Sequence, residues 1–133
     1  MSRLRLASVA ALLALAALGT LTTQVWGTHV VKINSKVSIA EHNLTFHGKV
    51  RSPNHGCVEG RKVRLKRHVT AGHDQTMGAA TTDSNGRWSV HVSGFAGITL
   101  NHFYAHLKRR SEGAAGTIFV CRGDRSRTIR PGT

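Results

Sequence analysis

The chain has 133 residues and carries 19 Lys and Arg against only 6 Asp and Glu, a formal net charge of +13. This length suffices for one modest hydrophobic core and excludes a second domain. The six acidic residues lie in different segments, so the sequence indicates no acid/base catalytic pair.

The N-terminus has the pattern of an export signal. Arg3 and Arg5 precede an apolar run over residues 6–18, which is too short for a membrane span of about 20 residues. We expect a signal peptide over residues 1–27, cut after Gly27. A cut after Gly19 and an uncleaved anchor are the alternatives. The mature chain, residues 28–133, is then a soluble, secreted, extracellular single domain of 106 residues with a net charge of +11.

Period-2 alternation of apolar and polar residues predicts short β-strands through the rest of the chain. In chain order, strands are expected within residues 30–39, 44–51, 62–68, 76–82, 88–92, 102–108, 117–121 and 125–129. Asn85-Gly86 predicts a two-residue hairpin turn with positive φ at both positions. The alternation predicts an apolar core of Val50, Val63, Leu65, Trp88, Val90, Ala105 and Val120. The same alternation predicts that Lys62, Arg64, Lys66 and His91 face solvent.

The two cysteines, Cys57 and Cys121, are most simply one disulfide, because an exported chain meets an oxidising environment. The bond would close a loop of about 65 residues and stabilise the fold by about 4 kcal/mol in the chain-entropy model. Neither cysteine has a Cys-x-x-Cys partner or lies in a catalytic signature.

About seven strands separated by Gly, Asn, Asp and Ser turns predict an all-β fold, an antiparallel β-sandwich of transthyretin-like or Ig-like type with one disulfide. A small barrel is the alternative. The matching segments are residues 46–52, Cys57, residues 60–65, residues 82–88, Tyr104-Ala105 and Cys121. In this order they resemble the transthyretin-like (prealbumin-like, carboxypeptidase-regulatory-like) domains of secreted bacterial proteins. That resemblance implies a seven-stranded sandwich used for binding, adhesion or spacing.

One enzyme of that superfold, a hydroxyisourate hydrolase, has a turn motif similar to residues 82–87, Thr-Asp-Ser-Asn-Gly-Arg. The resemblance stops at the C-terminus. The enzyme ends in Tyr-Arg-Gly-Ser, whereas this chain ends in Arg-Pro-Gly-Thr. Hairpin geometry alone explains the Asn-Gly dipeptide. We therefore expect no enzymatic activity.

The composition favours a small secreted interaction module that binds anionic extracellular or cell-envelope polymers. The candidate binding residues are Lys62, Arg64, Lys66, Lys108, Arg109 and Arg110. Affinity is expected to fall with salt and to rise between about pH 7.5 and 5.5, because the chain has nine histidines. These histidines show no metal-ligand spacing, and neither a metal nor a cofactor is expected. Three alternatives stay open: charge for solubility only, a protein-binding module with an apolar patch near Phe95 or Phe103, and the hydrolase.

Overall fold

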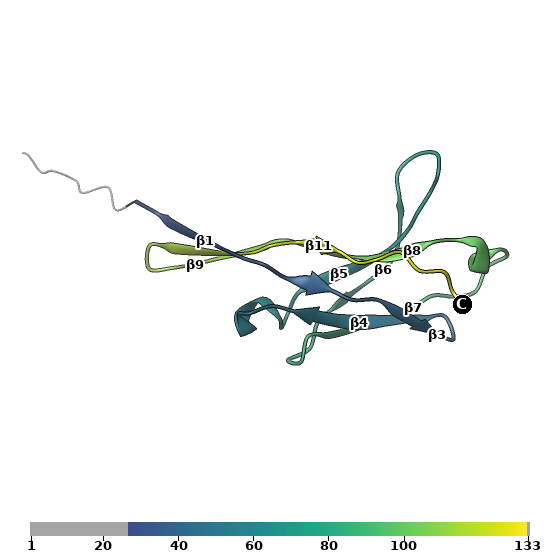
Figure 1. The fold of residues 1–133 in the computed structure, drawn as a ribbon, viewed down its shortest axis with the longest axis horizontal. Helices are drawn as coiled ribbons and strands as arrows, with labels where there is room; N and C mark the ends of the chain where they lie inside the picture. Colours follow the sequence, from purple (N-terminus) through teal and green to yellow (C-terminus); the bar gives the residue numbers. More distant parts are fainter. Residues whose placement is uncertain (1–26, 133) are drawn as a thin grey trace, which may run out of the picture.

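A computed structural model describes residues 27–132. Within that range the chain forms eleven β-strands, two short 3₁₀ turns and no α-helix (Figure 1). The strands are β1 (His29–Ile33), β2 (Lys36–Val37), β3 (Ala40–His42), β4 (Thr45–Arg51), β5 (Lys62–Arg67), β6 (Gln75–Thr81), β7 (Arg87–His91), β8 (Phe103–Leu107), β9 (Arg110–Ala114), β10 (Thr117–Cys121) and β11 (Asp124–Arg125). The 3₁₀ turns are η1 (His55–Cys57) and η2 (Ile98–Leu100). The predicted all-β class is confirmed.

Apart from Gly27, the expected signal peptide over residues 1–27 lies outside the described residues. The described residues include no helix long and apolar enough to cross a membrane.

Two sheets lie face to face and enclose the main core (Figure 1). One sheet has the strand order β11-β8-β5-β6. The other is built around β4, with β2 and β3 paired along one side and β7 along the other. The rings of Phe46 on β4 and Phe103 on β8 meet between the sheets with centroids 4.7 Å apart. All seven predicted core residues are buried, so the strand phase read from the alternation is confirmed.

A third sheet, β1-β10-β9, extends beyond the two layers (Figure 1). Here β1 pairs with β10 in parallel, and β10 pairs with β9 in an antiparallel hairpin. The expectation of about seven strands, all antiparallel, was therefore wrong in number and in the direction of one pair. Side-chain alternation indicates which face of a strand is buried but carries no information on its pairing partner. Strand β9, Arg-Ser-Glu-Gly-Ala, also lacks the apolar alternation by which strands are recognised.

The turns differ from the prediction. At Asn85-Gly86 only the glycine has a positive φ, of 77°. The Asp83 carboxylate accepts hydrogen bonds from the backbone N–H groups of Asn85 and Arg87, each at 2.9 Å, and this side chain shapes the turn. The left-handed glycine is required, because a Cβ on Gly86 would lie 2.4 Å from the carbonyl oxygen of Val50.

Two-residue turns with both residues at positive φ do occur, but elsewhere. They are Asn43-Leu44, with φ of 49° and 60°, and Ala115-Gly116, with φ of 45° and 83°. Leu44, expected as the first residue of a strand, is therefore a turn residue. Its turn allows β3 to pair back onto β4.

The expected strand over residues 125–129 is also shorter than predicted. Only Asp124–Arg125 forms a strand, and Ile129 makes an isolated bridge to Phe103. Between them, the hydroxyl of Ser126 replaces a backbone carbonyl, because it accepts a hydrogen bond from the N–H of Ala105 at 2.8 Å. This side-chain contact interrupts the regular ladder.

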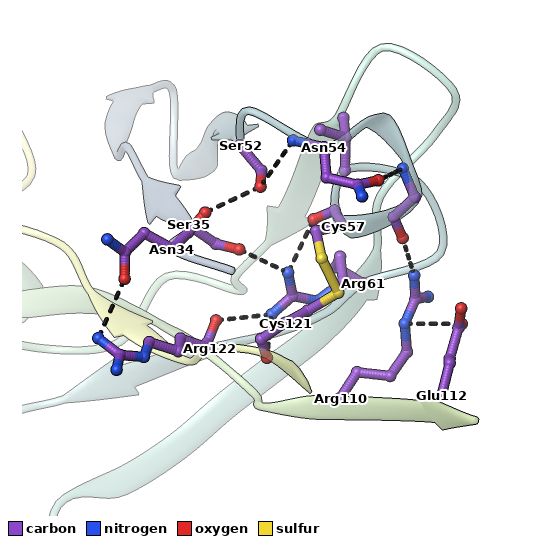
Figure 2. Close-up of a disulfide and its surroundings, with 12 residues drawn as sticks. Asn34, Ser35, Ser52, Asn54, Cys57, Arg61, Arg110, Glu112, Cys121 and Arg122 are labelled. Atoms are coloured by element: carbon purple, nitrogen blue, oxygen red, sulfur yellow. Dashed lines mark hydrogen bonds and ion pairs between the residues drawn. A yellow bond between two sulfur atoms is a disulfide. The ribbon is translucent and has the colours of Figure 1, made fainter. Parts of the chain in front are cut away.

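The predicted disulfide is confirmed. Cys57, at the end of η1, is bonded to Cys121, the last residue of β10, with their Cα atoms 5.4 Å apart (Figure 2). It ties the loop before β5 to the third sheet.

Candidate anion-binding face

Strand β5 presents three cationic side chains on the solvent side of its sheet. Val63 and Leu65 are completely buried in the core, so alternation turns Lys62, Arg64 and Lys66 to the opposite side. Lys62 is exposed, while Arg64 and Lys66 are half-buried along the sheet surface. The predicted outward orientation of this row is confirmed. His91, on the other sheet, is exposed as predicted.

The sheet register adds three further basic residues beside this row. His106 on β8 lies directly between Arg64 on β5 and Arg125 on β11. The Lys108 N–H donates to the Lys62 carbonyl at 3.0 Å, which places Lys108 beside Lys62. Neighbours across the sheet are about 5 Å apart, and alternate residues along a strand are about 6.6 Å apart. We call this surface the basic face; its residues are Lys62, Arg64, Lys66, His106, Lys108 and Arg125.

The acidic residues do not neutralise the basic face. All six lie within the described range. The carboxylates of Glu41, Asp83 and Asp124 accept hydrogen bonds from backbone N–H groups outside the basic face, and that of Glu112 pairs with Arg110 on its own strand. Glu59 is exposed next to η1. Among the described residues, Arg64, Lys62 and Lys108 make no side-chain ion pair.

Tyr104 and Asp74 close one end of the basic face. The Tyr104 hydroxyl donates to the Asp74 carboxylate at 2.7 Å, and the Arg125 guanidinium lies 3.8 Å from the centre of the Tyr104 ring. The hydrogen bond from Tyr104, followed by that from the Val69 N–H, lowers the pKa of Asp74. Burial, and then the contact with Asp74, raises the pKa of Tyr104. Tyr104 is 7% exposed, so its ring is unavailable for stacking on a ligand.

His106 lies in the middle of this cationic surface. The ring is half-buried, and its Nδ1 is buried without a hydrogen-bond partner. Burial lowers its pKa first, followed by repulsion from Lys66, Arg64 and Arg125. Both effects favour the neutral form of the imidazole. From the sequence, His106 was one of nine histidines without metal-ligand spacing, and its alternation with Ala105 and Leu107 indicated an outward orientation.

The other predicted binding residues do not join the basic face. Arg109 is exposed in the connection between β8 and β9, next to Gly123. Arg110 is held in place, because its guanidinium donates to the carbonyls of Glu59 at 3.1 Å and Gly60 at 3.0 Å. It also pairs with Glu112 at 3.2 Å. The cluster 108–110 is thus divided, and only Lys108 lies beside the β5 row.

Arg61 is the basic residue whose role the sequence analysis missed. It is completely buried beside the disulfide, and its guanidinium donates to backbone carbonyls and to the hydroxyl of Ser35 (Figure 2). The carbonyls belong to Cys57, Lys108, Cys121 and Arg122. Burial lowers its pKa, with a smaller contribution from Arg110. The alternation along the chain did contain a signal for this burial. Arg61 lies two and four residues before Val63 and Leu65, so its side chain points to the same, buried side.

Phe103 cannot contribute to the apolar patch that the protein-binding alternative predicts. Phe103 is completely buried, and Phe95 is half-buried with the Arg67 guanidinium 5.3 Å from its ring centre. The exposed large apolar side chains of residues 27–132 are instead Val30, Leu100 and Phe119.

The described part of the chain contains no group of three His, Cys, Asp or Glu side chains that could hold a metal ion. The chain matches no known protein family, no curated protein and no solved structure.

Proposed function

We propose that this protein is a secreted, non-catalytic β-domain that binds anionic extracellular polymers through its basic face. The observation that carries the proposal is the arrangement of cations from β5, β8 and β11 on one sheet surface without acidic partners. Cations that have no carboxylate partner among the described residues keep their charge available to an external anion. The disulfide supports export, because such bonds persist in oxidising compartments. In fold type, we propose a transthyretin-like or Ig-like sandwich, extended by the β1-β10-β9 sheet.

The test compares two variants of equal charge change. The face variant carries Lys62→Gln, Arg64→Gln and Lys66→Gln. The control variant carries Lys49→Gln, Arg51→Gln and Arg87→Gln, which lie on the other sheet and its edge and are all exposed. Binding to heparin and to teichoic acid is measured by calorimetry at about 50 and 300 mM salt.

We expect the wild type to bind at low salt and to lose affinity steeply as salt rises, because contacts between charged groups release counterions. The face variant should lose affinity by about tenfold or more, and its dependence on salt should flatten. The control variant should lose much less. Equal losses in both variants, or no binding by the wild type at about 50 mM salt, would leave solubility as the explanation for the charge.

A protein-binding role is the second candidate, favoured by the β1-β10-β9 sheet. Val30 and Phe119 are 48% and 37% exposed there, away from the main core. They lie on opposite faces of the sheet, because Val30 pairs with Ile118 whereas Phe119 pairs with Val31. Each exposes apolar area that suits a protein contact better than a polyanion. Light scattering of the wild type and of the Val30→Ser/Phe119→Ser variant tests for self-association through this sheet. The second candidate predicts an oligomer that this variant, but not the face variant, converts to monomer.

A further inference from the structure

We propose that the row Arg64, His106 and Arg125 is a subsite for one sulfate or phosphate ester group of a polymer that lacks aromatic bases, and that binding this group places a proton on His106. The inference rests on the proposed function, because it assigns a ligand chemistry to one part of the basic face.

The geometry of the row suits a tetrahedral oxyanion. Arg64, His106 and Arg125 are consecutive cross-strand neighbours on three adjacent strands, so an arginine stands on each side of His106. The Arg125 guanidinium lies over the ring of Tyr104, which precedes His106 by two residues on the same face of β8. Cross-strand neighbours are about 5 Å apart, so both arginines are near enough to donate to one group placed over His106.

The surroundings of His106 explain why an anion is linked to a proton. The charged and titratable groups near it are Lys66 and Arg64 from β5, Arg125 from β11, Tyr104 from its own strand, and Lys108 just after that strand. Asp74 is bonded to Tyr104 and His68 at the end of the face. Asp124, the residue before Arg125 on β11, accepts from the Val37 N–H and pairs with Lys36. Without an anion, the neighbouring cations oppose protonation of the imidazole. A bound anion offsets this repulsion and attracts the imidazolium directly, so protonation becomes more favourable than without the anion.

The aromatic residue beside the row restricts the class of polymer that the subsite would bind. Tyr104 is the aromatic residue beside the row, and its ring is buried beneath Arg125. Single-stranded nucleic acids bind most proteins by stacking bases on exposed rings. The basic face therefore favours ester groups on a sulfated glycan or on a polyol-phosphate chain, in which the charged groups carry the recognition.

The experiment follows the ring proton of each histidine by NMR from pH 8 to 4.5, with the His106 signal assigned by its loss in His106→Gln. Two probes of matched charge, a sulfated hexasaccharide and a glycerol-phosphate oligomer, distinguish the two sources of the ester group. His47→Gln is the control, because the cross-strand neighbours of His47 are Ala40 and Ser89 rather than arginines. Oligothymidylate of the same charge tests the restriction on bases.

We expect the His106 midpoint to lie below that of a free histidine without ligand and to rise on saturation with at least one of the two probes. Wild-type affinity should increase about fivefold from pH 7.5 to 5.0. His47→Gln should keep most of this increase, and His106→Gln should lose it.

An unchanged His106 midpoint in a protein that binds both probes with steep salt dependence would overturn the inference and leave the proposed function standing. Tighter binding of oligothymidylate than of either probe would overturn the restriction to polymers without bases. No binding by the wild type at low salt would overturn the proposed function and the inference together.

Discussion

Arg61 and Arg64 lie three residues apart on the chain and have opposite surroundings. The guanidinium of Arg61 is enclosed beside the disulfide and is held by backbone carbonyls and one hydroxyl (Figure 2). Arg64, on the solvent side of β5, lies beside other cations and has no ion-pair partner among the described residues. We call the first environment, formed by Arg61, Arg110, Cys57 and Cys121, the disulfide corner, and compare it with the basic face.

The comparison shows that net charge alone does not indicate what a basic residue does. In the disulfide corner, arginine donors replace a regular backbone ladder and fix η1 and the end of β10 against β5. On the basic face, the donors are left to solvent and to ligands. Substitutions in the corner should therefore change stability, and substitutions on the face should change binding.

The largest effect is expected from the disulfide. The double substitution Cys57→Ala/Cys121→Ala should lower the free energy of unfolding by about 4 kcal/mol, because the unfolded chain regains the freedom of a long loop. Urea denaturation measures the change. A loss of under about 1 kcal/mol would show that the corner is held by its hydrogen bonds alone.

Arg61→Met should lower the free energy of unfolding by about 3 kcal/mol, because it leaves buried carbonyls without hydrogen-bond donors. The matched control is Arg64→Met on the neighbouring surface, which should change stability by about 0.5 kcal/mol or less. Equal losses in the two variants would remove the distinction between the two regions.

Arg110→Ala should lower the free energy of unfolding by about 1 kcal/mol, because Arg110 holds η1 and the turn after it by hydrogen bonds. The loss is smaller than for Arg61 because this site is partly exposed. Arg109→Ala is the control, since its side chain is exposed. Hydrogen exchange should show faster opening at residues 55–60 in Arg110→Ala only. Unchanged exchange there would contradict the structural role given to Arg110.

The smallest effect concerns pH and Asp74, at the end of the basic face. Because its pKa is lowered on folding, its carboxylate adds stability above the pKa of the unfolded chain, and this contribution disappears as pH falls below about 4. Urea midpoints of Asp74→Asn should therefore decline less than those of the wild type between pH 6 and 3. Glu59→Gln, which alters an exposed carboxyl next to η1, should follow the wild type. An Asp74→Asn curve parallel to the wild type would contradict the role of the Tyr104 contact.

Local patterns in the sequence determined the parts of this protein that depend on one strand or one bond. The alternation along β5 was sufficient to place Val63 and Leu65 inside and Lys62 outside, because successive side chains of a strand point to opposite faces. Two cysteines in a chain with an export pattern were sufficient to predict their bond.

Only the tertiary structure decided how the strands pair, and with that the composition of the candidate site. Arg125 lies beside His106, and His106 beside Arg64, through the registers of β11, β8 and β5. These residues are far apart along the chain, and no local periodicity relates them. The parallel pairing of β1 with β10 likewise depends on contacts between distant segments. The division of residues 108–110 has the same physical cause. The three cations are alike in sequence, but the carbonyls that receive Arg110 are brought to it only when η1 folds against β9.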